Sequence, residues 1–198
     1  MKRRRAVVVV AGLITTALVR AVLRWQRNPS AYLYELSFSL GLSRPFITRP
    51  RLREILAPKP GERVLEVGVG KGYYSLHVAR WLEPGGVLDV LDIQQEMLDE
   101  TVRRVHESGI SAIVPVRGDA RRLPYQDNYF DAAYLNFVLG EIPDQDAALR
   151  ELRYVLKSGG RLVVGEAFVD PHMVRFGALR TRAEAAGLEF ECRRLADH

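Results

Sequence analysis

Short apolar runs and longer amphipathic segments alternate along the chain from Arg63 onward. The short runs are rich in Val, Leu and Ile and predict strands over residues 63–68, 86–93, 111–118, 130–137, 160–167 and 188–195. In the longer segments apolar residues recur every three or four positions, which predicts helices over residues 73–83, 95–109, 146–159 and 172–187. Because alternating strands and helices are joined by parallel crossovers, we expect an α/β fold with a doubly wound, mostly parallel sheet.

The residues before this region follow a different pattern. An aromatic and apolar run, YLYELSFSLGL, is followed by prolines at positions 45, 50, 58 and 60, and a short helix is expected over residues 52–56. We therefore divide the chain into a basic and apolar N-terminal helix over residues 1–27, a helical lid or connector over residues 28–60, and a ligand-binding α/β domain over residues 61–198.

The N-terminal helix contains an uncharged run at residues 6–19, with basic side chains on both sides. A secretory signal fits its start, but Arg20 stands where a small-residue cleavage site is expected. A spanning helix extended to Leu23 reaches about 27 Å when Arg20 snorkels, close to the bilayer core of about 30 Å. A helix in the membrane interface and a helix packed on the protein body remain open. We expect membrane association through residues 6–23, with the mode undecided.

The charge distribution narrows the classes of partner. The net charge is +5, but the first 27 residues hold seven basic side chains and no acid, so the remainder carries −2. A slightly acidic body without a basic stripe argues against nucleic acid as a partner. The single cysteine excludes an intramolecular disulfide framework, and the four scattered histidines show no metal-ligand spacing.

Three glycines mark the candidate ligand site. Gly68, Gly70 and Gly72 follow the first strand and lead into a helix, and ligands of doubly wound sheets bind at the carboxyl ends of the strands. The dinucleotide fingerprint G-x-G-x-x-G would place its third glycine at Tyr73, whose side chain would prevent the close packing that this glycine allows. The loop therefore disfavours an NAD-dependent reductase.

The segment EVGVGKG resembles the first motif of class I S-adenosylmethionine-dependent methyltransferases of the small-molecule and lipid type. LDIQQEML, GDARRLPYQDNYFD, FDAAYLNFVLGEIPD and LRELRYVLKSGGRLVV are similar to the later motifs of that family, in the same order. The resemblance implies a Rossmann-like methyltransferase fold and S-adenosylmethionine as the cofactor. It departs at Lys71, where small residues are common, and after the fifth strand, where the family has two more strands and this chain shows one candidate.

The resemblance also implies roles for individual residues. The glycines bring backbone close to the cofactor, and Glu66 orients the loop or holds the methionine amine. Asp92, followed by Ile93, takes the place of the acid that binds the ribose hydroxyls. Asp119 and Ala120 fall where the family contacts the adenine. Asp92 as a helix cap and Asp119 as a turn residue are the structural alternatives.

The remaining candidates lie near the expected position of the methyl group. Asn136 ends the fourth strand and is a candidate cofactor-binding residue, and Tyr73 and Phe137 are candidate walls beside the sulfonium of the cofactor. No residue stands out as a general base, and Asn136 and Glu141 are the weak candidates for a catalytic role.

Taken together, these features predict in-line transfer of a methyl group from S-adenosylmethionine to a small, lipophilic acceptor under the apolar lid. The alternative is a non-catalytic, membrane-tethered regulator that binds the cofactor. The N-terminal segment is expected to contact anionic membrane. Because the cofactor is intracellular, we expect the body on the cytoplasmic face.

Overall fold

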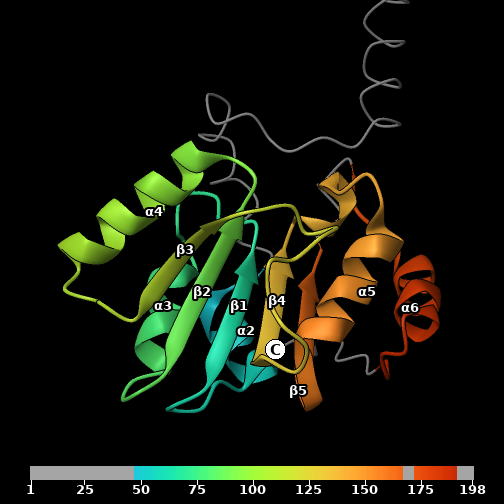
Figure 1. The fold of residues 1–198 in the computed structure, drawn as a ribbon, viewed down its shortest axis with the longest axis horizontal. Helices are drawn as coiled ribbons and strands as arrows, with labels where there is room; N and C mark the ends of the chain where they lie inside the picture. Colours follow the sequence, from blue (N-terminus) through green and yellow to red (C-terminus); the bar gives the residue numbers. More distant parts are fainter. Residues whose placement is uncertain (1–46, 167–171, 191–198) are drawn as a thin grey trace, which may run out of the picture.

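The structure is a computed structural model that describes residues 47–166 and 172–190. Its centre is a parallel sheet with the strand order β3-β2-β1-β4-β5 (Figure 1). The strands are β1 (Arg63–Val67), β2 (Val87–Asp92), β3 (Ile113–Arg117), β4 (Phe130–Asn136) and β5 (Leu156–Gly165). The order reverses beside β1, which pairs with both β2 and β4, and the predicted doubly wound fold is confirmed.

Helices cover both faces of the sheet. One face carries α2 (Arg49–Leu56), α3 (Ser75–Trp81) and α4 (Gln95–Glu107). The other carries α5 (Gln145–Val155) and α6 (Phe176–Ala185), while a short 3-10 helix, η2 (Leu139–Glu141), follows β4 (Figure 1). This arrangement leaves the carboxyl ends of β1, β2 and β4 open to a ligand.

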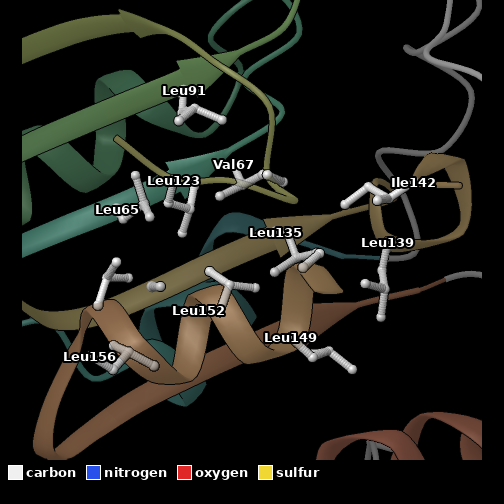
Figure 2. Close-up of a cluster of buried hydrophobic side chains, with 14 of the residues drawn as sticks. Leu65, Val67, Leu91, Leu123, Leu135, Leu139, Ile142, Leu149, Leu152 and Leu156 are labelled. Atoms are coloured by element: carbon white, nitrogen blue, oxygen red, sulfur yellow. The ribbon is translucent and has the colours of Figure 1, made fainter. Parts of the chain in front are cut away.

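The alternation of side chains along the strands produces a core on each face. On β1, Leu65 and Val67 join Leu135 of β4 and the apolar side of α5 (Figure 2). Val64 points the opposite way, into the cluster formed with α2, α3 and α4. Because β1 is buried on both faces, it is a central strand of the sheet, and its carboxyl end is packed from both sides.

Several element boundaries differ from the prediction; for example, helix α6 begins at Phe176 rather than at residue 172, and the starts of α2 and β5 have clear physical reasons. Helix α2 begins at Arg49 rather than at residue 52, because Thr48 caps it and Pro50 is tolerated in the first turn, where its missing N–H would have no helical acceptor. Strand β5 begins at Leu156 rather than at residue 160. Its pairing with β4 shifts after Leu156, and the irregularity absorbs the residues that the sequence pattern assigned to the end of a helix.

Several predicted segments lie outside the described residues. These are the N-terminal helix at 1–27, most of the connector at 28–60 and the end of the predicted strand at 188–195; its described residues 188–190 form no strand. Within residues 47–166 and 172–190, none of the helices combines the length and apolar character that crossing a membrane requires.

The core on the α5 face yields a stability prediction. Leu152 is fully buried in the cluster of Figure 2. Leu152→Ala removes buried methyl groups and leaves a cavity, so we expect the free energy of unfolding to fall by about 2–5 kcal/mol in urea denaturation. Arg150→Ala, at an exposed position of the same helix, should change it by less than about 0.5 kcal/mol. Equal effects of the two substitutions would contradict this description of the core.

Candidate functional site

A cavity of about 260 Å³ opens at the carboxyl ends of the strands, where the strand order reverses. Its walls come from the segments that follow β1, β2, β3 and β4. The predicted site residues that line it are Glu66, Gly68, Gly70, Tyr73, Asp92, Ile93, Asp119, Ala120, Asn136 and Glu141. Lys71 and Phe137 also line it. The structure therefore brings together nearly all the residues that the sequence singled out, with Gly72 as the exception.

The glycine loop after β1 has a backbone that side chains would block. Gly68 has a φ of +73°, and a Cβ atom there would lie 2.3 Å from Cγ2 of Val138. Gly68 also donates its N–H to the carbonyl oxygen of Leu91 on β2, at 2.8 Å. Only glycine accommodates this backbone conformation together with this contact, and the loop consequently presents bare backbone to the cavity.

Helix α4 holds the far side of the loop. The hydroxyl of Thr101 donates to the carbonyl oxygen of Gly70 at 3.3 Å, and the Arg104 guanidinium donates to the carbonyl oxygen of Lys71. A Cβ atom on Gly72 would lie 3.0 Å from Cγ2 of Thr101. Gly72 thus allows the loop to pack closely against α4. It faces the helix and not the cavity, which explains its absence from the cavity wall.

The supporting role of α4 was missed by the sequence interpretation. A signal for it exists, because Met97, Thr101 and Arg104 recur at helical spacing and therefore share one side of α4. Met97 itself lines the cavity, as do Tyr74, Gln94 and Arg121. Spacing indicates that such residues share a face, but only the fold shows that this face meets the glycine loop.

Glu66 carries a carboxyl group into an apolar setting. It is 2% exposed, and the hydroxyl of Ser75, the first residue of α3, donates to its Oε2 atom at 2.5 Å. Burial raises the pKa of Glu66 to about 8, because the hydrogen bond from Ser75 only partly offsets the loss of hydration. The side chain is therefore mostly protonated at neutral pH, and a cation placed beside it would favour its ionised form.

Asp92 connects the end of β2 to the glycine loop. Its Oδ2 atom accepts the N–H of Val69 at 3.1 Å and its Oδ1 atom accepts the N–H of Gln94 at 3.0 Å. The second contact forms a turn before α4 and not the helix cap considered as the structural alternative, because the N-cap position of α4 is Gln94. Burial raises the pKa of Asp92, against the effect of the surrounding backbone N–H groups. Asp92 also lines the cavity, so its carboxylate lies where the hydroxyls of a ligand can reach it.

Asp119 follows β3 and pairs with its neighbour. The Nη2 atom of Arg121 lies 2.6 Å from Oδ2, and the backbone N–H of Arg121 donates to Oδ1 at 2.9 Å. The Arg121 guanidinium lowers the pKa of Asp119. These hydrogen bonds correspond to the alternative of a turn residue. Because both side chains are partly exposed, the pair is open to rearrangement when a ligand enters.

Apolar and aromatic side chains form other parts of the wall. Ile93 is 49% exposed and presents its side chain at the cavity. The guanidinium of Arg49 lies 4.2 Å from the ring centroid of Tyr73, which also packs edge-to-face on Tyr74 at 4.8 Å. The contact with Arg49 shows that the Tyr73 ring accepts a cation in this fold.

The end of β4 combines a buried amide with an unusual backbone. Phe137 has a φ of +61°, which is costly for a residue with a large side chain. Its N–H donates to the carbonyl oxygen of Gly165 at 2.8 Å. The side-chain oxygen and nitrogen of Asn136 are both buried and have no hydrogen-bond partner among the described residues. Glu141, in η2, lines the same cavity.

Comparison with known proteins identifies a family that this chain matches. A model described as the ubiE/COQ5 methyltransferase family matches residues 37–177. The ubiquinone/menaquinone biosynthesis C-methyltransferase UbiE of Vibrio cholerae is 38% identical over 109 residues, which cover 54% of this chain and 42% of the relative. The protein of the same name from Pseudomonas putida is 34% identical over 114 residues, which cover 57% of this chain and 44% of the relative. The matched part thus spans less than half the length of these relatives.

Solved structures support the same fold. A methyltransferase from Aquifex aeolicus, titled SAM dependent, superposes with a TM-score of 0.70 at 20% identity, over 79% of this chain and 89% of that one. The [4+2]-cyclase SpnF superposes with a TM-score of 0.64 at 26% identity, over 87% of this chain and 67% of that one. The first likeness concerns the fold alone.

The buried carboxyl group of Glu66 predicts a pH dependence of stability. The unfolded side chain has a pKa near 4.3, so between about pH 4.5 and 8 the folded protein binds more protons here than the unfolded chain. This contribution to the free energy of unfolding falls as the pH rises through that window, by up to about 1.4 kcal/mol per pH unit. The stability of Glu66→Gln relative to wild type should therefore increase up to about pH 8 and then level off.

The measurement is urea denaturation of both proteins from pH 5 to pH 9. Glu189→Gln, at an exposed position, is the control for the effect of replacing a glutamate elsewhere in the chain. A constant difference between Glu66→Gln and wild type would show that Glu66 is ionised in the folded protein.

Proposed function

The chain belongs to the ubiE/COQ5 methyltransferase family, and we propose that it transfers a methyl group from S-adenosylmethionine to a ring carbon of a small, quinone-type acceptor. The resemblance to class I S-adenosylmethionine-dependent methyltransferases is confirmed by this membership. The alternative, a regulator that binds the cofactor without transfer, receives no support from the relatives, which are named as methyltransferases.

One observation carries the proposal. The bare backbone of Gly68 and Gly70 and the carboxylate of Asp92 meet in a single cavity, although they come from two different strands. An adenosyl sulfonium carries both a ribose with two hydroxyls and an amino-acid portion with an ammonium group. The cavity offers acceptor capacity at Asp92 for the hydroxyls and the Glu66 carboxyl for a cation, so the residues fit this cofactor.

The cofactor supplies a methyl group that is already activated by the positive charge on sulfur. The contribution of the protein is to position the reactants, and orientation alone is worth roughly 7–11 kcal/mol in favourable cases. The glycine loop would hold the amino-acid and ribose portions, while Ile93 and Ala120 would pack against the adenine. Asp119 would accept the adenine amine once Arg121 makes room.

The acceptor class rests on the relatives and on the wall of the cavity. Both cited relatives are named for ubiquinone and menaquinone biosynthesis and as C-methyltransferases. After the end of β4 the cavity is lined by the apolar side chains of Phe137, Val138 and Ile142, and Tyr73 lines the same cavity. A flat, lipophilic ring gains favourable burial there at little polar cost.

The ribose assignment predicts a selective loss of affinity. A hydrogen bond to a charged group contributes about 1.5–3 kcal/mol, so Asp92→Ala should weaken binding of S-adenosylhomocysteine by about 10–100-fold in calorimetry. Because Asp92 also binds the glycine loop, the decisive comparison uses a 2′-deoxy analogue of the ligand. Wild type should prefer the ribose form and the variant should not. Unchanged discrimination in the variant would exclude Asp92 as the ribose acceptor.

Methyl transfer itself is tested with labelled cofactor. Wild-type protein, S-adenosylmethionine with a labelled methyl group and a reduced naphthoquinone should yield a labelled, extractable product. Tight binding of S-adenosylhomocysteine without any transfer to such acceptors would overturn the proposed function.

We propose further that the protein works on the cytoplasmic face of a membrane, which it contacts through residues 6–23. The support is the apolar run at residues 6–19 with basic side chains on both sides, and the lipophilic character of the proposed acceptor. Leu13→Asp together with Leu18→Asp places charge in this run and should reduce co-sedimentation with anionic liposomes about tenfold or more. Leu152→Asn, a polar substitution in the core, tests whether loss of folding alone changes sedimentation. Equal binding by wild type and the double variant would rule out this anchor.

A further inference from the structure

The side-chain amide of Asn136 makes no hydrogen bond within the described part of the fold. Both polar atoms of its side chain are buried and lack a hydrogen-bond partner among the described residues, while the residue lines the cavity at the end of β4. Leaving a buried donor or acceptor unsatisfied costs about 1–3 kcal/mol for each group. An apolar residue of the same size would avoid this cost, so the amide is unfavourable for the folded protein alone.

The surroundings of Asn136 are built to admit its side chain. A Cβ atom on Gly165 of β5 would lie 2.3 Å from Oδ1 of Asn136 and 2.5 Å from Cδ1 of Ile47. Glycine at position 165 therefore leaves the space in which the amide sits. The next residue, Phe137, adopts a left-handed conformation with a φ of +61°. Backbone strain of this kind clusters at functional sites, where the surrounding structure holds it in place.

The chemistry of an amide limits what its partner can be. Nδ2 donates hydrogen bonds and Oδ1 accepts them. A hydroxyl oxygen satisfies both atoms, because it accepts from one and donates to the other. A carbonyl oxygen only accepts and would leave Oδ1 unsatisfied, whereas an ammonium group only donates and would leave Nδ2 unsatisfied. A hydroxyl therefore offers both a donor and an acceptor at a single position, which a carbonyl oxygen or an ammonium group does not.

We propose that Asn136 is the residue that recognises a ring hydroxyl of the acceptor. This inference rests on the proposed function. It adds the residue that binds the ring hydroxyl of the acceptor next to the apolar side chains of the cavity. Asn136 acts there as a positioning and specificity-determining residue. It holds the hydroxyl, and so orients the ring, while the apolar side chains around it contact the carbon skeleton.

A hydroxyl held in this way also assists the reaction. The new bond forms between the ring carbon and the methyl carbon, and the bond from methyl to sulfur breaks with its electron pair moving to sulfur. The ring carbon then loses its proton to water, which restores the aromatic ring. A hydrogen bond from the ring hydroxyl to Oδ1 increases electron density in the ring at the moment of attack. Asn136 itself neither gains nor loses a proton.

Equilibrium binding tests the proposal without requiring turnover. The ligands are 1,4-dihydroxynaphthalene and 1,4-naphthoquinone, which share a carbon skeleton and differ in whether their oxygens donate. Binding is measured by calorimetry under anaerobic conditions with saturating S-adenosylhomocysteine. The wild-type protein should bind 1,4-dihydroxynaphthalene with a dissociation constant at least about 10-fold lower than that of 1,4-naphthoquinone. This is the difference expected for one additional satisfied hydrogen bond in a buried site. Asn136→Leu, which is nearly isosteric, should bind both forms with similar affinity.

Two further measurements complete the test. Asn136→Leu should retain the wild-type affinity for S-adenosylhomocysteine and should raise the thermal midpoint of the free protein, because an unsatisfied amide is replaced by an apolar group. Asn136→Ala should also lose the preference for the dihydroxy form over the quinone. It replaces Asn136→Leu in the test if that variant does not fold. Ile142→Val changes the size of the cavity wall without changing hydrogen bonding and should keep the discrimination.

The opposing outcomes are distinct. Wild type that binds both forms equally, or an Asn136→Leu variant that still discriminates, would overturn the proposal. A loss of S-adenosylhomocysteine affinity in Asn136→Leu would instead assign the residue to the cofactor. Discrimination that depends on Asn136, in a protein that transfers no methyl group, would support this inference while the proposed function fails.

Discussion

The hydrogen bond between Asp92 and Val69 is the interaction on which the site depends. It fixes the glycine loop of β1 to the end of β2, and the contact between Gly68 and Val138 fixes the same loop to the segment after β4. The cavity lies where these three chain segments converge, at the reversal of the strand order. Every further feature of the site, from Glu66 below the loop to Asn136 beside it, takes its position from this convergence.

The packing of the core and the geometry of the site are connected through α4. Met97 and Leu98 of this helix are buried in the core on one face of the sheet. Thr101 and Arg104, on the next turns, hold carbonyl oxygens of the glycine loop. Apolar burial therefore fixes the helix, and the helix in turn fixes the backbone that lines the cavity. The site therefore shares its support with the core.

Three polar groups at the cavity are unfavourable for the folded chain by itself. Burial raises the pKa of both Glu66 and Asp92, and the amide of Asn136 lacks a hydrogen-bond partner within the described residues. A core designed only for stability would replace them with apolar side chains. All three groups lie at one end of the sheet. This is the pattern expected when polar groups that lower the stability of the folded protein are kept because they bind a ligand.

The sequence alone determined the order of strands and helices, the glycine loop and the acid at the end of β2, because each depends on residues close together in the chain. It also indicated Asn136 from its place at a strand end. Only the tertiary structure decided that Gly72 serves α4, that Thr101 and Arg104 support the loop, and that β5 begins at Leu156. These features depend on contacts between residues far apart in the sequence. Periodicity and turn chemistry describe local preference, whereas the distance between two strand ends is set by how the whole sheet packs.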